Sequence, residues 1–192
     1  MKIYTRNGDK GETGLPGAVR VSKSHLVIEV CGSVDETNCL LGCAIAHWGE
    51  QGQTATDPDL NSTLTQIQIE LFDLGSRVAA ALASAPKIVP AELDEENVRQ
   101  LELWIDQFEA SLPALQTFIL PSGSLAGCQL HLARTVCRRA ERRLVELIDA
   151  GTERELSIDL VYLNRLSDLL FVMARFANQE SGCIETPWTA SR

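Results

Sequence analysis

Residues 130–144 read LHLARTVCRRAERRL, and this stretch decides the fold. Its apolar residues recur at alternating intervals of three and four, which is the period of one face of an α-helix. With one more turn added, the set comprises Leu130, Ala133, Cys137, Ala140, Leu144 and Leu147. The stretch therefore predicts an amphipathic helix over 124–150, with an apolar stripe toward a core and a charged face away from it.

Four further regions of the chain carry apolar stripes of similar period. They cover residues 26–48, 58–84, 92–112 and 157–179. Long runs that alternate apolar and polar residues are absent, and so is a hairpin dipeptide between two such runs. Five long helices with short connections favour an all-α fold, namely a five-helix up-down bundle with an ordered N-terminal loop.

The chain is expected to form a single domain, because its 192 residues fit the usual domain length of roughly 100–200. Residues 1–24 contain several glycines and no sustained period, so they are interpreted as the ordered loop. The bundle would occupy 25–180, with linkers at 49–57 and 85–91. Residues 181–192 would form a loose tail.

The composition excludes several classes of partner. The formal net charge of −9 would repel nucleic acid. No apolar run reaches the ~18–20 residues of a membrane span, and the N-terminus lacks an apolar signal segment, so a cytoplasmic protein without a membrane partner is expected. The six cysteines form no C-x-x-C pair and the three histidines are isolated. They are interpreted as small buried thiols and as surface or satisfied core histidines, not as metal ligands.

The polar face of the 124–150 helix concentrates positive charge. Five of the 17 basic residues lie there, namely Arg134, Arg138, Arg139, Arg142 and Arg143. Helical spacing puts Arg134, Arg138 and Arg142 on one flank, together with Glu141. Glu141 follows Arg138 by three residues and can hold its side chain. A planar guanidinium donates two parallel hydrogen bonds to phosphate. The helix is therefore either an anion-binding surface or a solvated charged face.

The opening loop has a composition suited to an anion, because residues 5–14 read TRNGDKGETG. Its glycines let the backbone wrap closely around a ligand, and Lys10 adds a positive charge. Asp9 offers carboxylate oxygens, the ligand type that Mg²⁺ prefers. The segment is either such a site or a solvated turn. It lacks the Walker spacing, which disfavours a kinase or an ATPase.

Two further polar or aromatic features lie near the second half of the bundle. Phe118 sits in a connector that the bundle does not need for packing, and it is either a ligand contact or an anchor that plugs the bundle end. Ser122 or Ser124 can cap the helix that follows. Asn164 and Asp168 share a helix face beside an apolar stripe, which suits interface bonds and ligand contacts equally well; Arg165 can pair with Asp168.

Taken in chain order, these stretches resemble the PduO-type family of corrinoid adenosyltransferases. The matching segments are IYTRNGDKG at 3–11, RVSK at 20–23, GSVDETN at 32–38, FILP at 118–121, LHLARTVCRRAER at 130–142 and YLNRLSD at 162–168. Gly14, Thr37 and Ser122 depart from the residues usual in the family. These departures concern the shape of loops and the affinity for substrate rather than the charged groups.

The resemblance implies an enzyme that transfers the 5′-deoxyadenosyl group of ATP to the cobalt of cob(I)alamin. ATP and cobalamin would be its substrates and Mg²⁺ its metal, held through the ATP phosphates near Asp9 or Glu141. Matched positions imply nucleotide-binding roles for Thr5, Arg6, Asn7, Gly8, Asp9, Lys10, Gly11, Lys23, Arg138, Arg139, Glu141, Arg142 and Asn164. The implied catalytic set is Phe118, Arg138, Asp35 and Arg134. Phe118 would press on the lower face of the corrin, and Asp35 would pair with Arg134 across a subunit interface.

The resemblance also implies a homotrimer with its active sites at the subunit interfaces. A flavoprotein-type reductase as electron donor and an adenosylcobalamin-dependent enzyme as acceptor are candidate partners. Two other functions remain open at this stage. One is a non-catalytic corrinoid-binding chaperone or sensor of the same fold, and the other is a helical oligomerisation module whose arginines pair with acidic residues of a neighbour.

Overall fold

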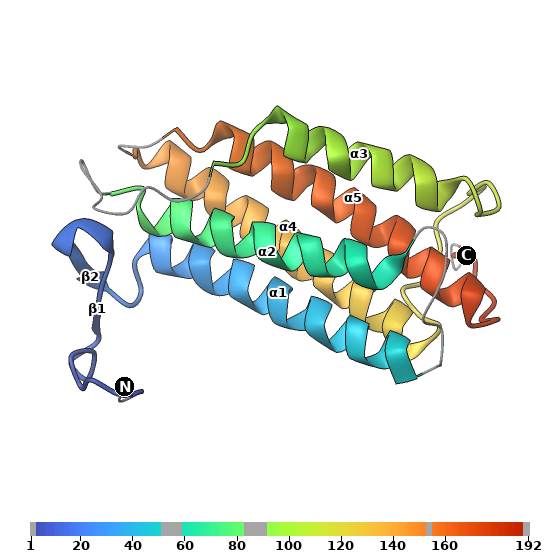
Figure 1. The fold of residues 1–192 in the computed structure, drawn as a ribbon, viewed down its shortest axis with the longest axis horizontal. Coiled ribbons are helices and arrows are strands. Elements are labelled where there is room, and N and C mark those ends of the chain that lie inside the picture. The colour runs from blue at the N-terminus through green and yellow to red at the C-terminus, as the bar shows by residue number, and fades with distance from the viewer. Residues whose placement is uncertain (1–2, 51–58, 83–91, 153–154, 190–192) are drawn as a thin grey trace.

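The chain folds into an antiparallel helical bundle, seen here in a computed structural model that describes residues 3–50, 59–82, 92–152 and 155–189. Its helices are α1 (Leu26–Glu50), α2 (Leu60–Ala79), α3 (Glu95–Glu109), α4 (Leu125–Asp149) and α5 (Ser157–Glu180). Successive helices run in opposite directions along one long axis (Figure 1). The predicted all-α up-down bundle is confirmed.

The two central helices of the bundle are α1 and α4, which pack against each other. Helix α2 packs on α1, α5 packs on α4, and α3 covers the outer side of α5 (Figure 1). The stripe that predicts α4 lies in this core, because its members from Leu130 to Leu147 are at most 1% exposed. Burial of each large apolar side chain stabilises the fold by roughly 1.5–3 kcal/mol, so these stripes hold the bundle together.

Helices α2, α3 and α4 begin at capping side chains rather than at the ends of the apolar pattern. Asp59 caps α2 by accepting from the N–H of Asn61, and Asp94 caps α3 by accepting from the N–H groups of Glu96 and Asn97. Ser124 caps α4 by accepting from the N–H of Gly127 at 3.0 Å. The predicted range 92–112 was therefore too long at both ends. The predicted linkers 49–57 and 85–91 fall largely outside the described residues.

A short β-hairpin lies within the segment 1–24, which the sequence predicted to be an ordered loop. Strands β1 (Glu12–Gly14) and β2 (Arg20–Ser22) pair antiparallel across a 3-10 turn at Pro16–Ala18. The hairpin gave no strand signal in the sequence because three residues are too few to display a period of two. Gly17 and Ala18 at φ 76° and 61° make the tight reversal. The hairpin stands beyond the first turn of α1 (Figure 1).

The segment after α5 is not the loose tail that the sequence suggested. The N–H of Leu120 donates to the carbonyl of Thr186 at 2.9 Å, and the N–H of Trp188 donates to the carbonyl of Phe118 at 2.7 Å. These bonds form a short antiparallel bridge between the connector before α4 and the chain after α5. Composition gave no signal for it, because backbone groups make these contacts and any residue type carries them.

Two buried polar contacts fasten the helices to one another. Arg77 of α2 makes a bidentate contact to Asp159 of α5, at 2.8 and 2.9 Å, and both side chains are almost fully buried. The hydroxyl of Tyr162 donates to the Glu70 carboxylate at 2.6 Å. Burial, reinforced by the negative charge of Glu70, raises the pKa of Tyr162 well above its ordinary value, so this phenol stays protonated. None of the described helices is both long and apolar enough to cross a membrane.

Candidate functional site

The N-terminal loop is closed by its own backbone and by one lysine. The N–H of Gly11 donates to the carbonyl of Gly8 at 3.2 Å, and the N–H of Lys23 donates to the carbonyl of Gly11 at 2.8 Å. The Lys23 amine packs over Gly8, where an added Cβ would lie 3.2 Å from Nζ. The structure thus brings Lys23 onto the loop that the sequence assigned to a nucleotide, and a side chain at Gly8 would require the lysine to shift.

The remaining residues of the loop lie at the surface. The Oγ1 of Thr5 accepts a hydrogen bond from the Asn7 N–H at 3.5 Å, and Arg6, at φ 62°, places its guanidinium over the ring of Tyr4. Asp9 and Lys10 are exposed. Both charges are therefore accessible to a ligand that approaches from outside.

Arg20 is a residue of this loop region that the sequence reasoning did not weigh. Its guanidinium donates to the carbonyl of Asn7 at 3.0 Å and to the carboxylate of Glu12 at 3.4 Å. The contact ties β2 to the glycine loop and fixes the path of the backbone between them. Its position in the segment 20–23 was noted, but the backbone acceptor has no signature in sequence.

Arg138 and Arg142 are the two most accessible cations of α4. Both are exposed, and within the described residues neither has an acidic partner. They lie one turn apart on the same flank of the helix. A solvated charged face would normally place acids at neighbouring turns, as Glu146 does for Arg143 at 2.7 Å. Here the nearest acids are engaged elsewhere, Glu141 by Asn164 and Glu146 by Arg143, so the two guanidiniums favour an external anion.

Arg139 points to a different part of the surface. It forms an ion pair with Glu36 of α1 across the groove between α1 and α4. This groove of about 510 Å³ is lined by Ile28, Glu29, Gly32, Ser33, Glu36 and Arg139. The structure therefore separates Arg139 from Arg138 and Arg142, as the helical spacing predicted. Glu36 was not foreseen as a partner, although it lies in the matched segment at 32–38.

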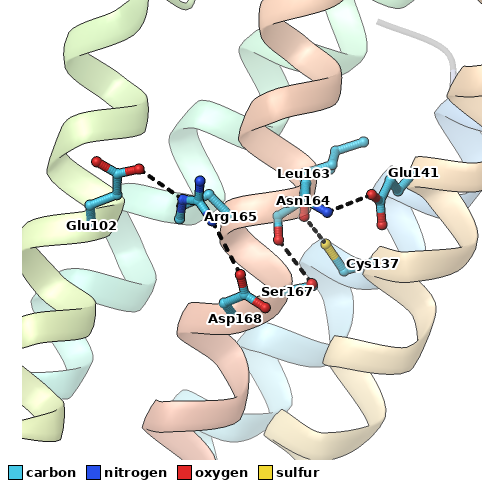
Figure 2. Close-up of polar contacts among 8 residues, drawn as sticks. All are labelled: Glu102, Cys137, Glu141, Leu163, Asn164, Arg165, Ser167 and Asp168. Atoms are coloured by element: carbon cyan, nitrogen blue, oxygen red, sulfur yellow. Dashed lines mark hydrogen bonds and ion pairs between the residues drawn. The ribbon is translucent and has the colours of Figure 1, made fainter.

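Glu141 and Asn164 meet between α4 and α5, and Figure 2 shows this contact. The amide of Asn164 donates to the Glu141 carboxylate at 2.8 Å. The expectation that Glu141 holds Arg138 was wrong, because the facing helix supplies a closer partner than the same helix does. Arg165 pairs with Asp168 at 3.3 Å, as predicted, and also with Glu102 of α3 at 2.9 Å. The hydrogen bond to Glu141 holds the Asn164 amide beside Arg138 and Arg142 of α4.

Asp35 and Arg134 do not meet within one copy of the chain. Asp35 lines a groove of about 270 Å³ between α1 and α2, whereas Arg134 belongs to α4. The Nε of Arg134 is buried and has no hydrogen-bond partner in the described ranges. Burial and the nearby charge of Arg138 lower the pKa of Arg134. Among the residues that the structure describes, Arg134 therefore has no counterion.

Phe118 lies on the surface, because 77% of it is exposed. The idea that it plugs the end of the bundle is wrong, since a plug would be buried. The aromatic residues that fill this end are Trp48, Phe108 and Phe176. Phe118 is instead presented outward by a connector whose backbone pairs with Trp188. An exposed aromatic ring on a fastened loop suits contact with a flat apolar ligand.

The glycine loop and Phe118 lie at opposite ends of the molecule. The hairpin stands next to the start of α1, and the connector with Phe118 lies beside the start of α4, at the other end of the bundle (Figure 1). The 25 residues of α4 give this axis a length of roughly 37 Å. Groups this far apart cannot hold the two reacting ends of one small substrate within a single protomer.

The thiols and imidazoles depart in part from the expectation. All six cysteines are free, and Cys137 is buried, where burial raises its thiol pKa; Cys39 and Cys43, however, are exposed. His131 is buried, yet neither of its ring nitrogens has a partner in the residues that the structure describes, so it is not a satisfied core histidine. The described residues contain no cluster of three or more His, Cys, Asp or Glu side chains arranged for a metal.

The sequence matches a family described as cobalamin adenosyltransferase over residues 3–177. A corrinoid adenosyltransferase of Bacillus subtilis is 45% identical over 95% of this chain and 89% of its own length. A cobalamin adenosyltransferase of Cupriavidus metallidurans is 42% identical over 100% of this chain and 96% of its own. The corrinoid adenosyltransferase of Mycobacterium tuberculosis is 39% identical over 97% of this chain and 93% of its own length.

Solved structures give the same result. A variant of a PduO-type ATP:corrinoid adenosyltransferase from Lactobacillus reuteri, complexed with cobalamin and ATP, superposes with a TM-score of 0.85. It is 33% identical, and the alignment covers 100% of this chain and 98% of that one. Another variant of that enzyme, complexed with ATP, has a TM-score of 0.81 at 32% identity, over 97% of this chain and 100% of the other.

Proposed function

The chain belongs to the cobalamin adenosyltransferase family, and from this premise we propose that its active site forms between two copies of the chain. In this arrangement the glycine loop of one copy faces the arginine flank of α4 in the next. The protein itself is an ATP:corrinoid adenosyltransferase. It transfers the 5′-deoxyadenosyl group of ATP to the cobalt of cob(I)alamin and releases triphosphate.

The reaction needs position and charge stabilisation rather than acid–base groups. The filled orbital of Co(I) attacks C5′ of ATP, the new cobalt–carbon bond forms, and the C5′–oxygen bond breaks with its electron pair leaving on the triphosphate. No proton moves at the reacting carbon. Alignment of C5′ over cobalt can contribute roughly 7–11 kcal/mol, and donors at the departing oxygens contribute about 3–4 kcal/mol each.

The observation that carries the proposed site is the flank made by Arg138 and Arg142. These exposed guanidiniums lack acidic partners in the described residues, and the Glu141–Asn164 pair holds a polar amide beside them. A triphosphate supplies the missing negative charge through bidentate hydrogen bonds. An acidic protein of net charge −9 would not otherwise keep two neighbouring cations uncompensated.

The distance between the two ends of the bundle supports a shared site. ATP joins C5′ to its triphosphate through a single oxygen, so the groups that hold the phosphates and those that meet the corrin must lie close together. Within one copy, the glycine loop and Phe118 are separated by roughly the length of α4. A second copy, placed beside the first, brings the loop of one next to the α4 surface of the other. A closed homotrimer satisfies every such site with one repeated interface.

Arg134 and Asp35, which form no ion pair within the described ranges, support the same interface. Arg134 has a buried Nε without an acceptor in the described part of the chain, and Asp35 lines an exposed groove. We assign them to each other across neighbouring subunits. A carboxylate from the adjacent copy would supply the acceptor that the buried Nε of Arg134 lacks and the counterion for its charge. Phe72 in the same groove is 68% exposed and offers apolar area for burial by that copy.

Mg²⁺ fits the loop side of this site as a companion of ATP. Asp9 is an exposed carboxylate on the glycine loop, and Glu141 lies on the arginine flank with one oxygen engaged by Asn164. Mg²⁺ commonly binds through one or two carboxylates together with substrate phosphates and water. Asp9 is the better candidate because Glu141 already accepts a hydrogen bond. When bound, the ion would neutralise charge on the triphosphate.

Phe118 is proposed to serve the reduction that precedes transfer. Its ring would occupy the position of the lower axial base and exclude water from that face of the corrin. A Co(II) centre without the lower ligand is easier to reduce, because the ligand's lone pair no longer destabilises the electron that is added. The exposed position of the ring supports this role.

Titration calorimetry with ATP tests the arginine flank. We expect Arg138→Ala to weaken ATP binding by roughly 1.5–3 kcal/mol, as for the loss of a charged hydrogen bond. Arg143→Ala is the matched control, because Arg143 lies on the same helix but is paired with Glu146. An ATP affinity that is equal in Arg138→Ala and in the wild-type protein would remove Arg138 from the site.

The partners beyond a second copy stay predictions, namely a flavoprotein-type reductase as electron donor and an adenosylcobalamin-dependent enzyme as acceptor. The same holds for a cytoplasmic location. Rapid mixing of the protein with ATP and reduced cobalamin tests the transfer without any of them. An absorbance change with stoichiometric release of triphosphate is expected, whereas release of phosphate or diphosphate would point to other chemistry.

A further inference from the structure

The connector that carries Phe118 is anchored by two side chains from the last turns of α5. The guanidinium of Arg175 donates to the carbonyl of Pro113 at 2.8 Å, at the start of the connector. The amide of Asn178 donates to the carbonyl of Ser122 at 2.8 Å and accepts from the N–H of Ser124 at 2.9 Å, at its end. Arg175 and Asn178 are 3% and 1% exposed, so both anchors are buried.

Arg175 also fastens the segment after α5. Its Nε donates to both oxygens of Glu185, at 2.9 and 3.2 Å. Thr186 and Trp188, directly beyond, make the two backbone hydrogen bonds of the bridge, which flank Ile119 and include the carbonyl of Phe118 as an acceptor. One buried guanidinium therefore holds both strands of this bridge, the connector through Pro113 and the tail through Glu185.

Apolar packing contributes little to this arrangement. Ile184, next to Glu185, is 91% exposed, and Phe118 itself is 77% exposed. An open groove of about 470 Å³ runs beside the anchor; it is lined by Leu112, Pro113, Arg175, Gln179, Gly182, Cys183, Ile184 and Glu185. With so little buried apolar area, the bonds of Arg175 to Glu185 restrain the tail together with the backbone bonds of the bridge.

We propose that Arg175 is a positioning residue for Phe118 and acts through Glu185 and the tail that it secures. This inference rests on the proposed role of Phe118 in the reduction of cob(II)alamin. The guanidinium fork is suited to the task because it binds a carboxylate with one edge while a further N–H reaches a carbonyl. A ring that must replace an axial ligand has to stand at a fixed height below the corrin. The bridge sets that height.

Glu185→Ala tests the restraint without removing a buried cation from the bundle. Amide hydrogen exchange is measured in the intact protein at Leu120 and Trp188, whose N–H groups form the bridge. We expect their exchange to accelerate about tenfold, the effect of losing a charged hydrogen bond on local opening. Glu96→Ala is the matched control, because it breaks an exposed ion pair with Arg99 far from the connector. Unchanged exchange in Glu185→Ala would overturn the proposal.

The functional readout is the ratio of the rate from cob(II)alamin with a reductant to the rate from pre-reduced cob(I)alamin. Glu185→Ala is expected to lower this ratio several-fold with ATP affinity unchanged, and to cause no further fall when combined with Phe118→Ala. Arg175→Lys keeps the charge without the fork, and its ratio should fall between wild type and Glu185→Ala. A wild-type ratio despite faster exchange refutes the positioning role. Phe118→Ala is measured in parallel. A wild-type ratio in Phe118→Ala would mean that the proposed role of Phe118 is wrong, whereas a lowered ratio in Phe118→Ala with a wild-type ratio in Glu185→Ala would refute only the positioning role.

Discussion

Phe118 exposes an aromatic ring to solvent on a connector whose backbone is tied down. Removing an exposed side chain usually changes stability by less than about 0.5 kcal/mol, so Phe118→Ala should fold normally. We predict that it keeps ATP binding, loses most activity from cob(II)alamin, and retains most activity from chemically pre-reduced cob(I)alamin. Steady-state rates with the two oxidation states provide the measurement. An equal loss with both substrates would contradict a role confined to reduction.

His131 gives the stability of the protein a specific dependence on pH. Burial, reinforced by the charge of Arg134 and opposed by Glu185, lowers its pKa from 6.5 to about 4. The unfolded chain therefore binds a proton more readily than the folded one between these values. Stability from the neutral imidazole is fully present above about pH 6.5 and is lost as the pH falls toward 4.

The matched variant for this effect is His131→Leu, which removes the titrating group. We predict that the free energy of unfolding of the wild type, relative to His131→Leu, is constant above pH 6.5 and falls by about 2–3 kcal/mol down to pH 4. Denaturant titrations at several pH values measure it. Parallel pH profiles for wild type and His131→Leu would show that the imidazole is free to take up a proton in the fold.

At the scale of residues, contacts within one helix followed from the sequence, whereas contacts between helices did not. The helical spacing placed Arg138 and Arg142 on one flank and Arg139 on another, because the geometry of a helix is local. It assigned Glu141 to Arg138, and the true partner is Asn164 on the facing helix. Partners of this kind depend on the packing between helices. The two anchors of the connector were missed because they bind backbone carbonyls, which any residue supplies.

At the scale of elements, α2 and α5 are joined by the bidentate contact between Arg77 and Asp159. Breaking a buried ion pair leaves an uncompensated charge, so we predict that Arg77→Ala destabilises the fold by about 3–5 kcal/mol. The double variant Arg77→Met with Asp159→Leu should recover much of this loss, because it removes both charges. Chemical denaturation of the two variants measures the difference. Equal destabilisation in the single and double variants would show that packing, not charge, is lost.

The apolar stripes predicted the existence of all five helices but not their ends. An apolar stripe shows which face of a helix is buried along its length. The N-terminal end of the helix depends instead on which side chain accepts hydrogen bonds from the free N–H groups. Asp59 and Asp94 supply those acceptors for α2 and α3. The hairpin of β1 and β2 and the bridge at Ile119 escaped prediction because each consists of too few residues for a period.

At the scale of the whole molecule, the up-down topology separates the parts of the site. Chain direction puts the glycine loop at one end of the bundle and Phe118 at the other (Figure 1). The family resemblance implied a site between subunits. The distance between the glycine loop and Phe118, however, follows only from the direction of the helices in the folded bundle. The proposal of a shared site thus depends on the fold, and a second copy of the chain is its natural complement.

Mixing of two defective variants tests this claim most directly. One variant carries Lys10→Ala with Lys23→Ala in the loop, and the other carries Arg138→Ala with Arg142→Ala in α4; each alone should be nearly inactive. After equal co-expression, random assembly creates a site with two intact halves in about a quarter of the interfaces, so about a quarter of wild-type activity should return. Activity in the mixture no higher than the mean of the two variants would contradict a site shared between subunits.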